Sequence, residues 1–512
     1  MKTPPGTPVH PAEAADVAPG RSRTVRAGRM APSRRTVLKR LAAAGAGLAA
    51  WTAPSAEAAE SPGAAPAIAP AGSSATRRRL ADRVARTPMV DTHEHLIEEA
   101  DRLRGGGQPR VPCDDWALLF THYLDSDLRT SGMSRADWDR FTSPDEDATS
   151  KWSLLAPYWP LVKHTGYAQA VRIAIRQLYG VSELSTATIA QVQAGYERTR
   201  QPGFYRKILQ DHANLESCQV NCITGEPFKP SAMPTLLMQD LSIVGMFAGP
   251  NIGQYAPPTG ITVGSLGDWY RVMDWWFERY APLAVAVKSQ QAYSRDIDYA
   301  RVPAEKAEPV FAKVLRKDKV SAEERKALED HLFWCAVDRA SAHGLPVKLH
   351  TGYYAGHNSM PLSRLSQNPG SAAELCRLGP EARFVFMHIG YPYYEEFLAL
   401  AKQWSNAYVD LCWSWIINPV AAKDYLKKHL LTAPVQKVLP FGGDYIPVEP
   451  VLGHAVIARR GITLALAELV EEGWLMLDEA LDLVDPILRG NAHRLFELAR
   501  KTEALTRPGA GS

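Results

Sequence analysis

The alternation of short apolar runs with longer helical stretches is the feature that most limits how this chain can fold. From about residue 86 onward such runs recur eight times, and helix-patterned segments separate them. One of these segments starts at Ser321, a typical helix N-cap residue, and stops at Gly344. Parallel strands joined by crossover helices produce this alternation, so we predict an α/β fold, a (β/α)8 TIM barrel over residues 86–505. The expected strands are residues 88–93, 218–223, 235–239 or the neighbouring 242–247, 283–288, 345–350, 383–388, 407–412 and 437–442.

One interval in this pattern is too long for a simple crossover. About 125 residues separate the first expected strand from the second, and most of them are rich in Trp and Tyr and have helical patterning. We therefore predict a helical insertion at about residues 100–206. Active sites of TIM barrels lie at the face formed by the loops after the strands, so this insertion is expected to cover that face as a lid.

Residues 1–58 carry the three parts of a targeting peptide. Arg34 and Arg35 precede a weakly apolar run at residues 41–51, and residues 56–58 form a small-residue cleavage site of the A-x-A type. Paired arginines before an Ala- and Gly-rich run resemble a twin-arginine signal, and the alternative is a disordered basic tail.

A twin-arginine signal predicts export of the folded precursor from a bacterium by the twin-arginine machinery, to the periplasm or the outside. The apolar run is about half of the ~20 residues that span a bilayer, so we expect no membrane segment in the mature form. Residues 59–85 are typical of a flexible linker.

The remaining composition excludes several classes of function. Beyond residue 58 the chain has 49 Lys and Arg against 52 Asp and Glu, which gives no electrostatic footprint for nucleic acid. Nucleotide-binding glycine loops and the G-x-S-x-G elbow of serine hydrolases do not occur. We expect mainly buried thiols, with at most one disulfide, from the scattered cysteines at 113, 218, 222, 335, 376 and 412. A homo-oligomer is left open.

The strongest chemical signal is VDTHEHL, in which His93 and His95 stand two apart at the end of an expected strand. The period of two in a strand directs both imidazoles to one face, where they can converge on a cation. Asp91 has the same parity and is expected beneath them as an acceptor for the imidazoles. Thr92 and Glu94 are expected to face the helices, unless the strand has ended at residue 93.

Three more expected strands end in residues of the same chemical type. His350 and His388 terminate strands, and Asp444 follows the last one. A closed barrel brings its strand ends into one ring, so these side chains are expected to meet the pair at 93 and 95. Four imidazoles and a carboxylate match the ligands of zinc or a similar divalent metal, as one ion or two.

These motifs resemble the amidohydrolase superfamily, and within it the amidohydrolase-related branch (amidohydrolase family 2) and the nodulin/FluG-type domain. The resemblance covers about residues 86–500. It rests on the metal motifs above and on the segments THYLDSDLRTSGM (121–133), VKSQQAYSR (287–295), LPVKLHTGYY (345–354), FVFMHIGYPYYEE (384–396), NAYVDLCW (406–413) and FGGDYIP (441–447).

The resemblance implies roles for the matching residues. The imidazoles of 93 and 95 would bind a metal, and His350 would bind it or a second one. His388 would be a ligand or a hydrogen-bonding electrophile, and Asp444 would be a ligand that also transfers the proton. Lys288 matches the position of the carboxylated lysine that bridges two metals in some members, and the alternative is an ordinary ammonium group. Gly443 departs from the pattern, because relatives often have Ser or Thr there.

The resemblance implies a metal-dependent hydrolase, in which a metal-activated water attacks an amide, ester or lactone of a small polar or anionic substrate. The same scaffold in relatives supports nonoxidative decarboxylation and sugar isomerisation, so a metal-dependent decarboxylase is an alternative. A noncatalytic exported barrel that binds a metal or ligand is the second alternative.

Four residues are expected to bind substrate. Arg295 and Tyr293 follow Lys288 and are placed to hold a substrate carboxylate, with a structural salt bridge as the alternative for the arginine. Trp413 is expected in the pocket wall, and the alternative is packing under the lid. His122 would reach down from the insertion to substrate, and the alternative is a histidine whose hydrogen bonds are satisfied within the lid.

Overall fold

The computed structural model describes residues 74–107, 110–223 and 225–507. The predicted signal peptide and residues 59–73 of the predicted linker lie outside the described residues. Helix α1 (Ala75–Arg86) shows that the linker prediction was wrong for residues 75–85. Ser74 caps this helix, and its apolar face packs on helix α20 (Glu449–Glu471). None of the described helices is long and apolar enough to span a membrane.

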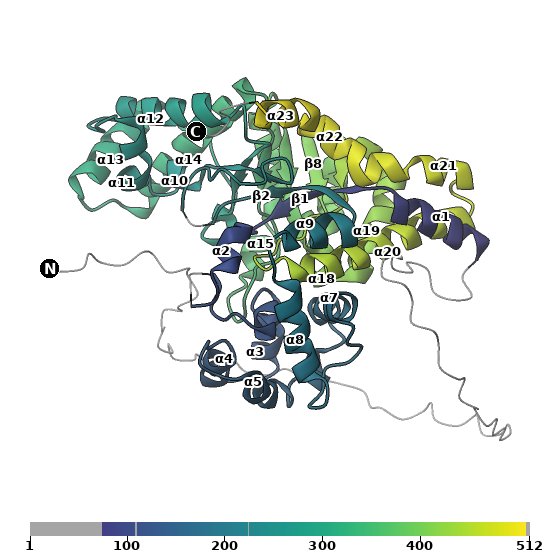
Figure 1. Ribbon diagram of the computed structural model, residues 1–512. Coiled ribbons are helices and arrows are strands. Elements are labelled where there is room, and N and C mark those ends of the chain that lie inside the picture. The colour runs from purple at the N-terminus through teal and green to yellow at the C-terminus, as the bar shows by residue number, and fades with distance from the viewer. Residues whose placement is uncertain (1–73, 108–109, 224, 508–512) are drawn as a thin grey trace, which may run out of the picture. The chain divides into compact units, whose positions relative to one another are not determined.

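Parallel strands form the centre of the fold, as the sequence predicts (Figure 1). β1, β2 and β3 pair in that order, and β4 to β9 pair in sequence order. β3 and β4 are two parts of one barrel strand, interrupted only at Asp240. The strands are β1 (Met89–Glu94), β2 (Leu215–Val220), β3 (Leu237–Gln239), β4 (Leu241–Ser242), β5 (Val287–Ser289), β6 (Val347–Leu349), β7 (Phe384–Phe386), β8 (Ala407–Asp410) and β9 (Val438–Leu439).

Backbone hydrogen bonds close this sheet into a barrel. Val285 N–H donates to Gln239 O at 3.0 Å, which continues the pairing across the break at Asp240. Thr92 N–H donates to Phe441 O at 2.9 Å, which joins the first strand to the segment after the last. The predicted TIM barrel is therefore confirmed.

Helices follow each strand from β3/β4 onward. Ser321 accepts from the N–H of Glu324 at the start of α14, so the predicted N-cap is confirmed. The elements after β4 are α10 (Val244–Phe247), α11 (Ile252–Tyr255), η4 (Pro257–Thr259) and α12 (Leu266–Tyr280); after β5, η5 (Gln291–Tyr293), α13 (Ala304–Arg316) and α14 (Ala322–Ala342); after β6, α15 (Leu362–Leu365) and α16 (Asn368–Leu378); after β7, η6 (Met387–Gly390) and α17 (Tyr394–Gln403); after β8, α18 (Ser414–Ile417), α19 (Pro419–Thr432) and η7 (Val435–Lys437); after β9, α20, α21 (Leu477–Asp482), η8 (Pro486–Gly490), α22 (Asn491–Leu495) and α23 (Leu498–Leu505).

The alternative third strand at residues 242–247 is wrong, because residues 244–247 form α10. Its apolar residues Met246 and Phe247 are fully buried, and a short buried helix has the same composition as a buried strand. All six cysteines are free thiols, so none of these positions forms a disulfide.

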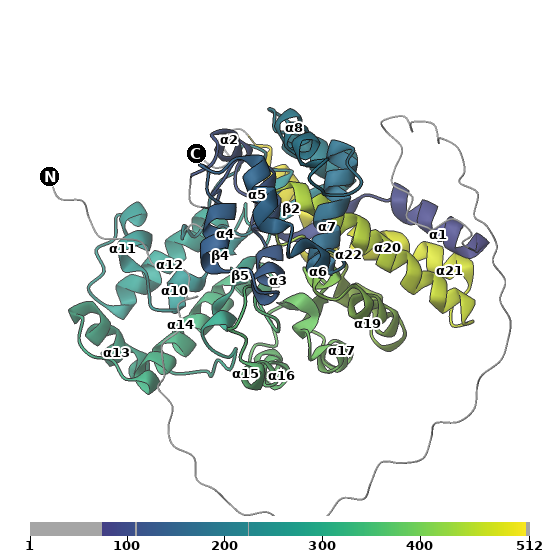
Figure 2. The same cartoon turned by 90° about the horizontal axis from the view of Figure 1, so that it is seen from below.

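The segment between β1 and β2 holds the insertion helices, which lie in front of the barrel strands in Figure 2. Arg102 anchors them, because its buried guanidinium donates to Glu449 of α20 at 2.8 Å and to Tyr196 at 3.2 Å. The elements are α2 (Glu99–Leu103), η1 (Trp116–Phe120), α3 (Leu124–Thr130), α4 (Arg135–Phe141), α5 (Ala148–Leu155), α6 (Trp159–Val162), α7 (Gly166–Ala174), η2 (Ile175–Tyr179), α8 (Ile189–Thr199), α9 (Phe204–Arg206) and η3 (Lys207–His212).

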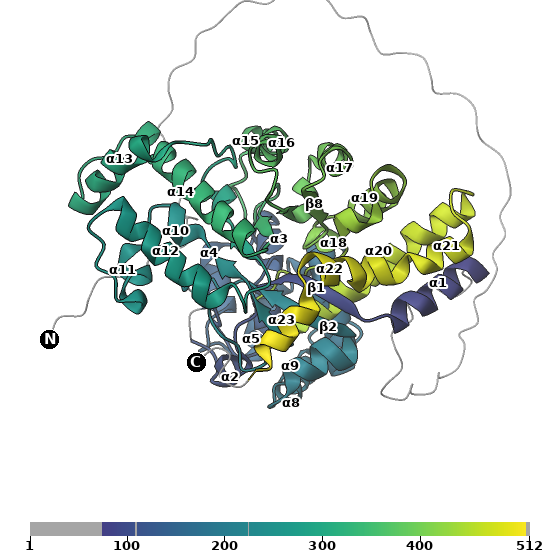
Figure 3. The ribbon, with the colours of Figure 1, turned by 90° about the horizontal axis from the view of Figure 1, so that it is seen from above.

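An apolar cluster closes the opposite end of the barrel. Figure 3 shows α22 and α23 crossing in front of the strands at this end. Phe496, at the end of α22, is 1% exposed. It packs with residues from the strands and from the two helices: Val90, Met238, Val285, Val385, Leu439, Ala492, Leu495 and Leu498.

Candidate metal centre

The closure of the barrel brings a carboxylate to His93 of β1 and to His95, which follows the strand directly. Nε2 of His93 and Nε2 of His95 lie 3.3 Å apart. Oδ1 of Asp444, from the loop after β9, lies 3.2 Å from each of them. The backbone N–H of Asp444 also donates to His93 O at 2.9 Å.

Two further imidazoles lie beside this cluster. His350 follows β6 and His388 follows β7, and Nδ1 of the first lies 3.0 Å from Nε2 of the second. Nε2 of His388 is 4.0 Å from Oδ2 of Asp444. Asp444 contacts His93, His95 and His388, whereas His350 contacts His388, so His350 sits at the edge of the cluster.

Backbone carbonyls fix the tautomers of two rings. Nδ1 of His388 lies 3.0 Å from Cys412 O, and Nδ1 of His95 lies 3.0 Å from Asn221 O. A carbonyl oxygen only accepts, so Nδ1 carries the proton in each neutral ring and Nε2 keeps its lone pair. This tautomer of His388 suits a metal ligand, and it disagrees with the alternative in which Nε2 donates to a substrate carbonyl.

The ring of His350 is held in the same way from its other nitrogen. Its Nε2 lies 2.9 Å from Tyr353 O, so the neutral ring carries its proton there and Nδ1 keeps its lone pair. That lone pair then faces the lone pair of His388 at 3.0 Å. Two lone pairs at this separation repel each other, and a cation beside them would relieve the repulsion.

The protonation states fit a cation as well. Burial lowers the pKa of His93 and His350 well below the usual value and that of His388 to about 4. Burial alone would raise the pKa of Asp444, but the neighbouring imidazoles 93 and 95 hold it well below its usual range. Neutral imidazoles around a carboxylate are the donor set of zinc and similar metals.

Two groups of donor atoms lie within 4.8 Å of one another in the described residues. One is His93, His95 and Asp444, and the other is His388, Cys412 and Asp444. Cys412 was not predicted. Cys412 is the last residue of an expected strand, so its place among the donor atoms could have been predicted from the sequence. The residues therefore fit a divalent metal.

Lys288 lies in the middle of β5 and is 1% exposed. Burial lowers its pKa to about 8, although the charge of Asp444 acts in the opposite direction. Among the described residues its amine nitrogen has no hydrogen bond or ion pair. An amine with this pKa is neutral in about a tenth of the molecules at pH 7.

The predicted directions of three residues of β1 need correction. Oδ1 of Asp91 accepts from the backbone N–H of His93 at 3.0 Å and of Gly443 at 3.3 Å, not from an imidazole. Glu94 is fully buried and Oε2 accepts from the N–H of Tyr445 at 2.7 Å. The register of β1 shifts between residues 91 and 94, and such an irregularity ends the simple alternation of faces.

Thr92 also departs from its predicted place against the helices. Its hydroxyl donates to Oδ2 of Asp410 at 2.7 Å in the barrel interior. Nearby, the ammonium of Lys348 donates to both oxygens of Asp240 at 3.0 and 2.9 Å and to Thr92 O at 2.8 Å. Sequence reasoning missed this buried layer, because Lys348 and Asp240 are 108 positions apart and carry no local motif.

Aromatic side chains surround the metal centre. The ring centroids of Trp413 and His388 lie 5.2 Å apart, and those of Tyr293 and His350 lie 4.5 Å apart. Trp413 is fully buried beneath Tyr123, which comes from the insertion and stacks on it at 4.5 Å. His122 lies on the insertion beside Tyr123, with the two rings 4.2 Å apart.

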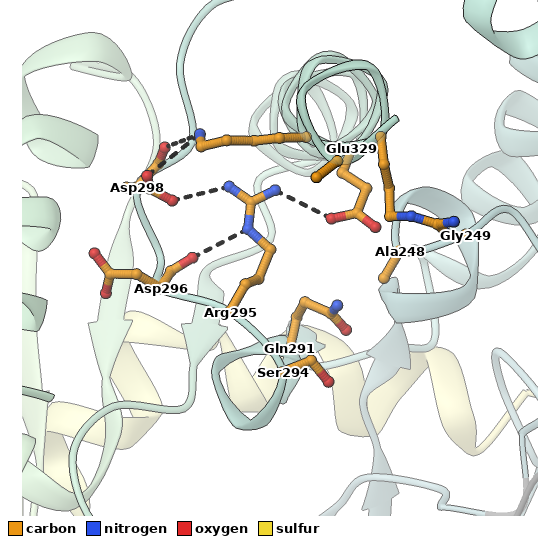
Figure 4. Close-up of a pocket in the computed structure, with 11 residues that line it drawn as sticks. Ala248, Gly249, Gln291, Ser294, Arg295, Asp296, Asp298 and Glu329 are labelled. Atoms are coloured by element: carbon orange, nitrogen blue, oxygen red, sulfur yellow. Dashed lines mark hydrogen bonds and ion pairs between the residues drawn. The ribbon is translucent and has the colours of Figure 1, made fainter. Parts of the chain in front are cut away.

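The prediction that Arg295 holds a substrate carboxylate is wrong in this structure, because protein carboxylates already occupy its guanidinium. It pairs with Asp298 at 2.9 Å, Glu329 at 3.1 Å and Asp330 at 2.6 Å. Figure 4 shows it in a hollow of about 610 Å³ between α10, the loop after β5 and α14. None of the metal-centre residues lines this hollow. Glu329 and Asp330 lie on a helix more than 30 positions away, which is why the sequence motif did not reveal them.

Comparisons with known sequences agree with this geometry. Residues 300–498 match the family model described as Amidohydrolase. Protein fluG of Emericella nidulans is 28% identical over 229 residues, which are 42% of this chain and 26% of that protein. The chain therefore spans about a quarter of the length of that relative.

Two uronate isomerases match over more of the chain. The enzyme of Rhizorhabdus wittichii is 22% identical over 447 residues, which are 79% of this chain and 92% of that protein. The crystal structure of uronate isomerase from Thermotoga maritima superimposes with a TM-score of 0.67 at 15% identity and covers 82% of this chain and 97% of that one. Residues 300–498, which include strands β6 to β9, thus match the Amidohydrolase model, and the barrel has the fold of a uronate isomerase.

Proposed function

We propose that the protein is a metal-dependent hydrolase that cleaves an amide, ester or lactone bond in a small polar or anionic substrate. The observation that carries the proposal is the gathering of the Nε2 atoms of His93, His95 and His388 around the carboxylate of Asp444. A noncatalytic binder has no need of a buried carboxylate placed to move a proton.

The metal would be held by His93, His95, His388 and Asp444, with His350 at its edge. Zinc is our choice, because neutral imidazoles with one carboxylate suit it. When bound, such an ion lowers the pKa of a water molecule from 15.7 to about 7. We further propose that Lys288 reacts with carbon dioxide to form a carbamate, losing a proton, since its amine is buried, unpaired and of lowered pKa.

The chain's own residues supply the remaining chemistry. The carboxylate of Asp444 accepts the proton of the attacking water and returns it to the leaving group. The Nδ1–H of His388 stays on Cys412 O, which keeps its ring in one orientation. Tyr293 and Trp413 form walls that exclude bulk water, and His122 lies at the insertion side of the site.

A second candidate is the isomerisation of a uronate. The match to the Rhizorhabdus uronate isomerase along 92% of that protein supports it. Proton transfer between neighbouring carbons of a sugar acid would again use a carboxylate base, and the carboxylate of Asp444 would act as that base.

The decisive experiment is a product screen with the zinc-loaded protein. Release of an amine or alcohol from a panel of amides, esters and lactones supports the hydrolase. Conversion of glucuronate or galacturonate to the ketose supports the isomerase, and carbon dioxide release from aromatic and enol acids supports a decarboxylase. Asp444→Asn is the control, because turnover that survives this change would contradict its role. A protein that binds zinc but turns over none of these compounds would favour the noncatalytic binder.

We also propose that the precursor is exported through a twin-arginine signal, which the pair Arg34 and Arg35 supports. Replacing both by lysine is expected to retain the protein in the cytoplasm of a bacterium with that machinery. Equal export of both forms would contradict the proposal.

A further inference from the structure

The backbone at Asp444 adopts a conformation that a non-glycine residue rarely takes. Its φ is 64°, in the left-handed region, and such a conformation persists only when the surroundings enforce it. From this backbone the side chain reaches the imidazole of His93 in β1 and that of His95 just after it. Whatever holds the backbone therefore also aims the carboxylate.

Two buried carboxyl groups hold the peptide N–H groups on either side of Asp444. The N–H of Gly443 donates to Oδ1 of Asp91 at 3.3 Å, and the N–H of Tyr445 donates to Oε2 of Glu94 at 2.7 Å. Both carboxyl groups come from β1. The strand that supplies the two imidazoles thus also fixes the loop that supplies the carboxylate.

The side chain of Glu94 fills the space next to Gly443. A Cβ atom added to Gly443 would stand 1.9 Å from Oε1 of Glu94, far inside any van der Waals contact. With the Glu94 carboxyl group in this place, position 443 has no room for a side chain.

Glutamine is the conservative replacement for Glu94. It has the same shape and keeps an acceptor oxygen for the N–H of Tyr445.

We propose that Glu94 is a positioning residue, which sets the carboxylate of Asp444 on the metal by filling the space at Gly443 and binding the N–H of Tyr445. The proposal rests on the proposed function, because it takes Asp444 as a ligand and proton carrier. Glu94 touches neither metal nor substrate in this assignment.

The test compares Co²⁺ affinity and the visible spectrum of the Co²⁺ form across variants of the full chain. Glu94→Ala is expected to weaken Co²⁺ binding by about 10–100-fold, the usual effect of losing an outer hydrogen-bond partner, and to change the spectrum. Glu94→Gln is expected to restore binding to within about threefold of the original protein. Glu396→Ala, which removes an exposed carboxylate of α17, is the matched control and is expected to change nothing.

A second pair of variants tests the mutual fit. Gly443→Ser alone is expected to weaken Co²⁺ binding about 10-fold or more, because its Cβ meets Glu94. The double variant Glu94→Ala with Gly443→Ser is expected to bind more tightly than either single variant, since the clash is gone and the serine hydroxyl stands in the vacated space. Losses that simply multiply in the double variant would overturn the proposal.

A crystal structure separates this proposal from the proposed function. In Glu94→Ala the φ of Asp444 is expected to leave the left-handed region, whether or not a metal binds. Where this variant does not fold, Glu94→Met fills the same volume without an acceptor and replaces it. An unchanged backbone at Asp444 together with unchanged Co²⁺ affinity would refute the positioning role, whereas an original protein that binds no Co²⁺ would refute the proposed function alone.

Discussion

The two ends of the barrel are filled in opposite ways. At the end covered by the insertion, His93, His388 and Asp444 are buried with their polar atoms facing one another, and Asp444 and His388 both have positive φ. At the other end the interior is apolar and closes on Phe496. The polar cluster at the first end lowers the stability of the fold but places the groups needed for a reaction. The apolar cluster at the other end raises the stability through packing.

The largest expected effect is a loss of activity without a loss of stability. Asp444→Asn removes the proton acceptor, so we expect kcat to fall at least about 10³-fold with the substrate found by the screen. Asparagine tolerates a left-handed backbone well and keeps the shape of the side chain with one acceptor oxygen, so the midpoint of urea unfolding of the metal-free protein should change little. If the variant unfolds at a clearly lower urea concentration, Asp444 contributes to the stability of the fold as well as to the reaction.

The sequence predicts the metal centre better than it predicts the support around it. The meeting of His93, His95 and Asp444 follows from the closure of the barrel, which brings the ends of its strands together. Glu94 could not be placed, because the register shift in β1 is an irregularity that local patterning does not encode. Arg295 was misassigned, because its partners on α14 lie beyond any local motif.

At the opposite end of the barrel the expected effect of a substitution is a loss of stability and not of activity. Phe496→Ala leaves a cavity in the apolar cluster and is expected to lower the free energy of unfolding by about 3–5 kcal/mol. The metal content per folded chain should stay unchanged, measured by elemental analysis of the native fraction. A variant that folds normally but loses its metal would break the division between the two ends.

Two neighbouring lysines test where the functional end of the barrel gives way to the stabilising end. Lys288 and Lys348 pair in register on β5 and β6, and both are buried. Only Lys348 has an ion pair, with Asp240, so Lys348→Met leaves a buried carboxylate alone and should cost about 3–5 kcal/mol of unfolding free energy. Lys288→Met should cost less than about 1 kcal/mol but abolish the carbamate seen by mass spectrometry. Equal destabilisation by the two changes would contradict this division.

The smallest expected effect is a dependence of stability on pH that arises at the metal centre. The pKa of His388 is about 4 in the folded protein and about 6.5 when unfolded, so the unfolded chain binds more protons between these values. Its contribution therefore lowers stability as pH falls from about 6.5 towards 4, by up to about 1.4 kcal/mol per pH unit. Asp91 and Asp410, whose pKa values burial raises to about 7 and about 6, act in the opposite direction.

Comparing the metal-free protein with His388→Asn cancels the carboxyl contributions, because both proteins contain them. As the pH is lowered from 6.5, the original protein should lose stability relative to His388→Asn. The unfolding free energy of the original protein minus that of the variant should fall by about 3 kcal/mol in total at pH 4. A difference that stays constant over this range would mean that the imidazole remains accessible to protons in the folded state. The polar end would then be more open to solvent than its burial indicates, and the contrast with the apolar end would be one of composition only.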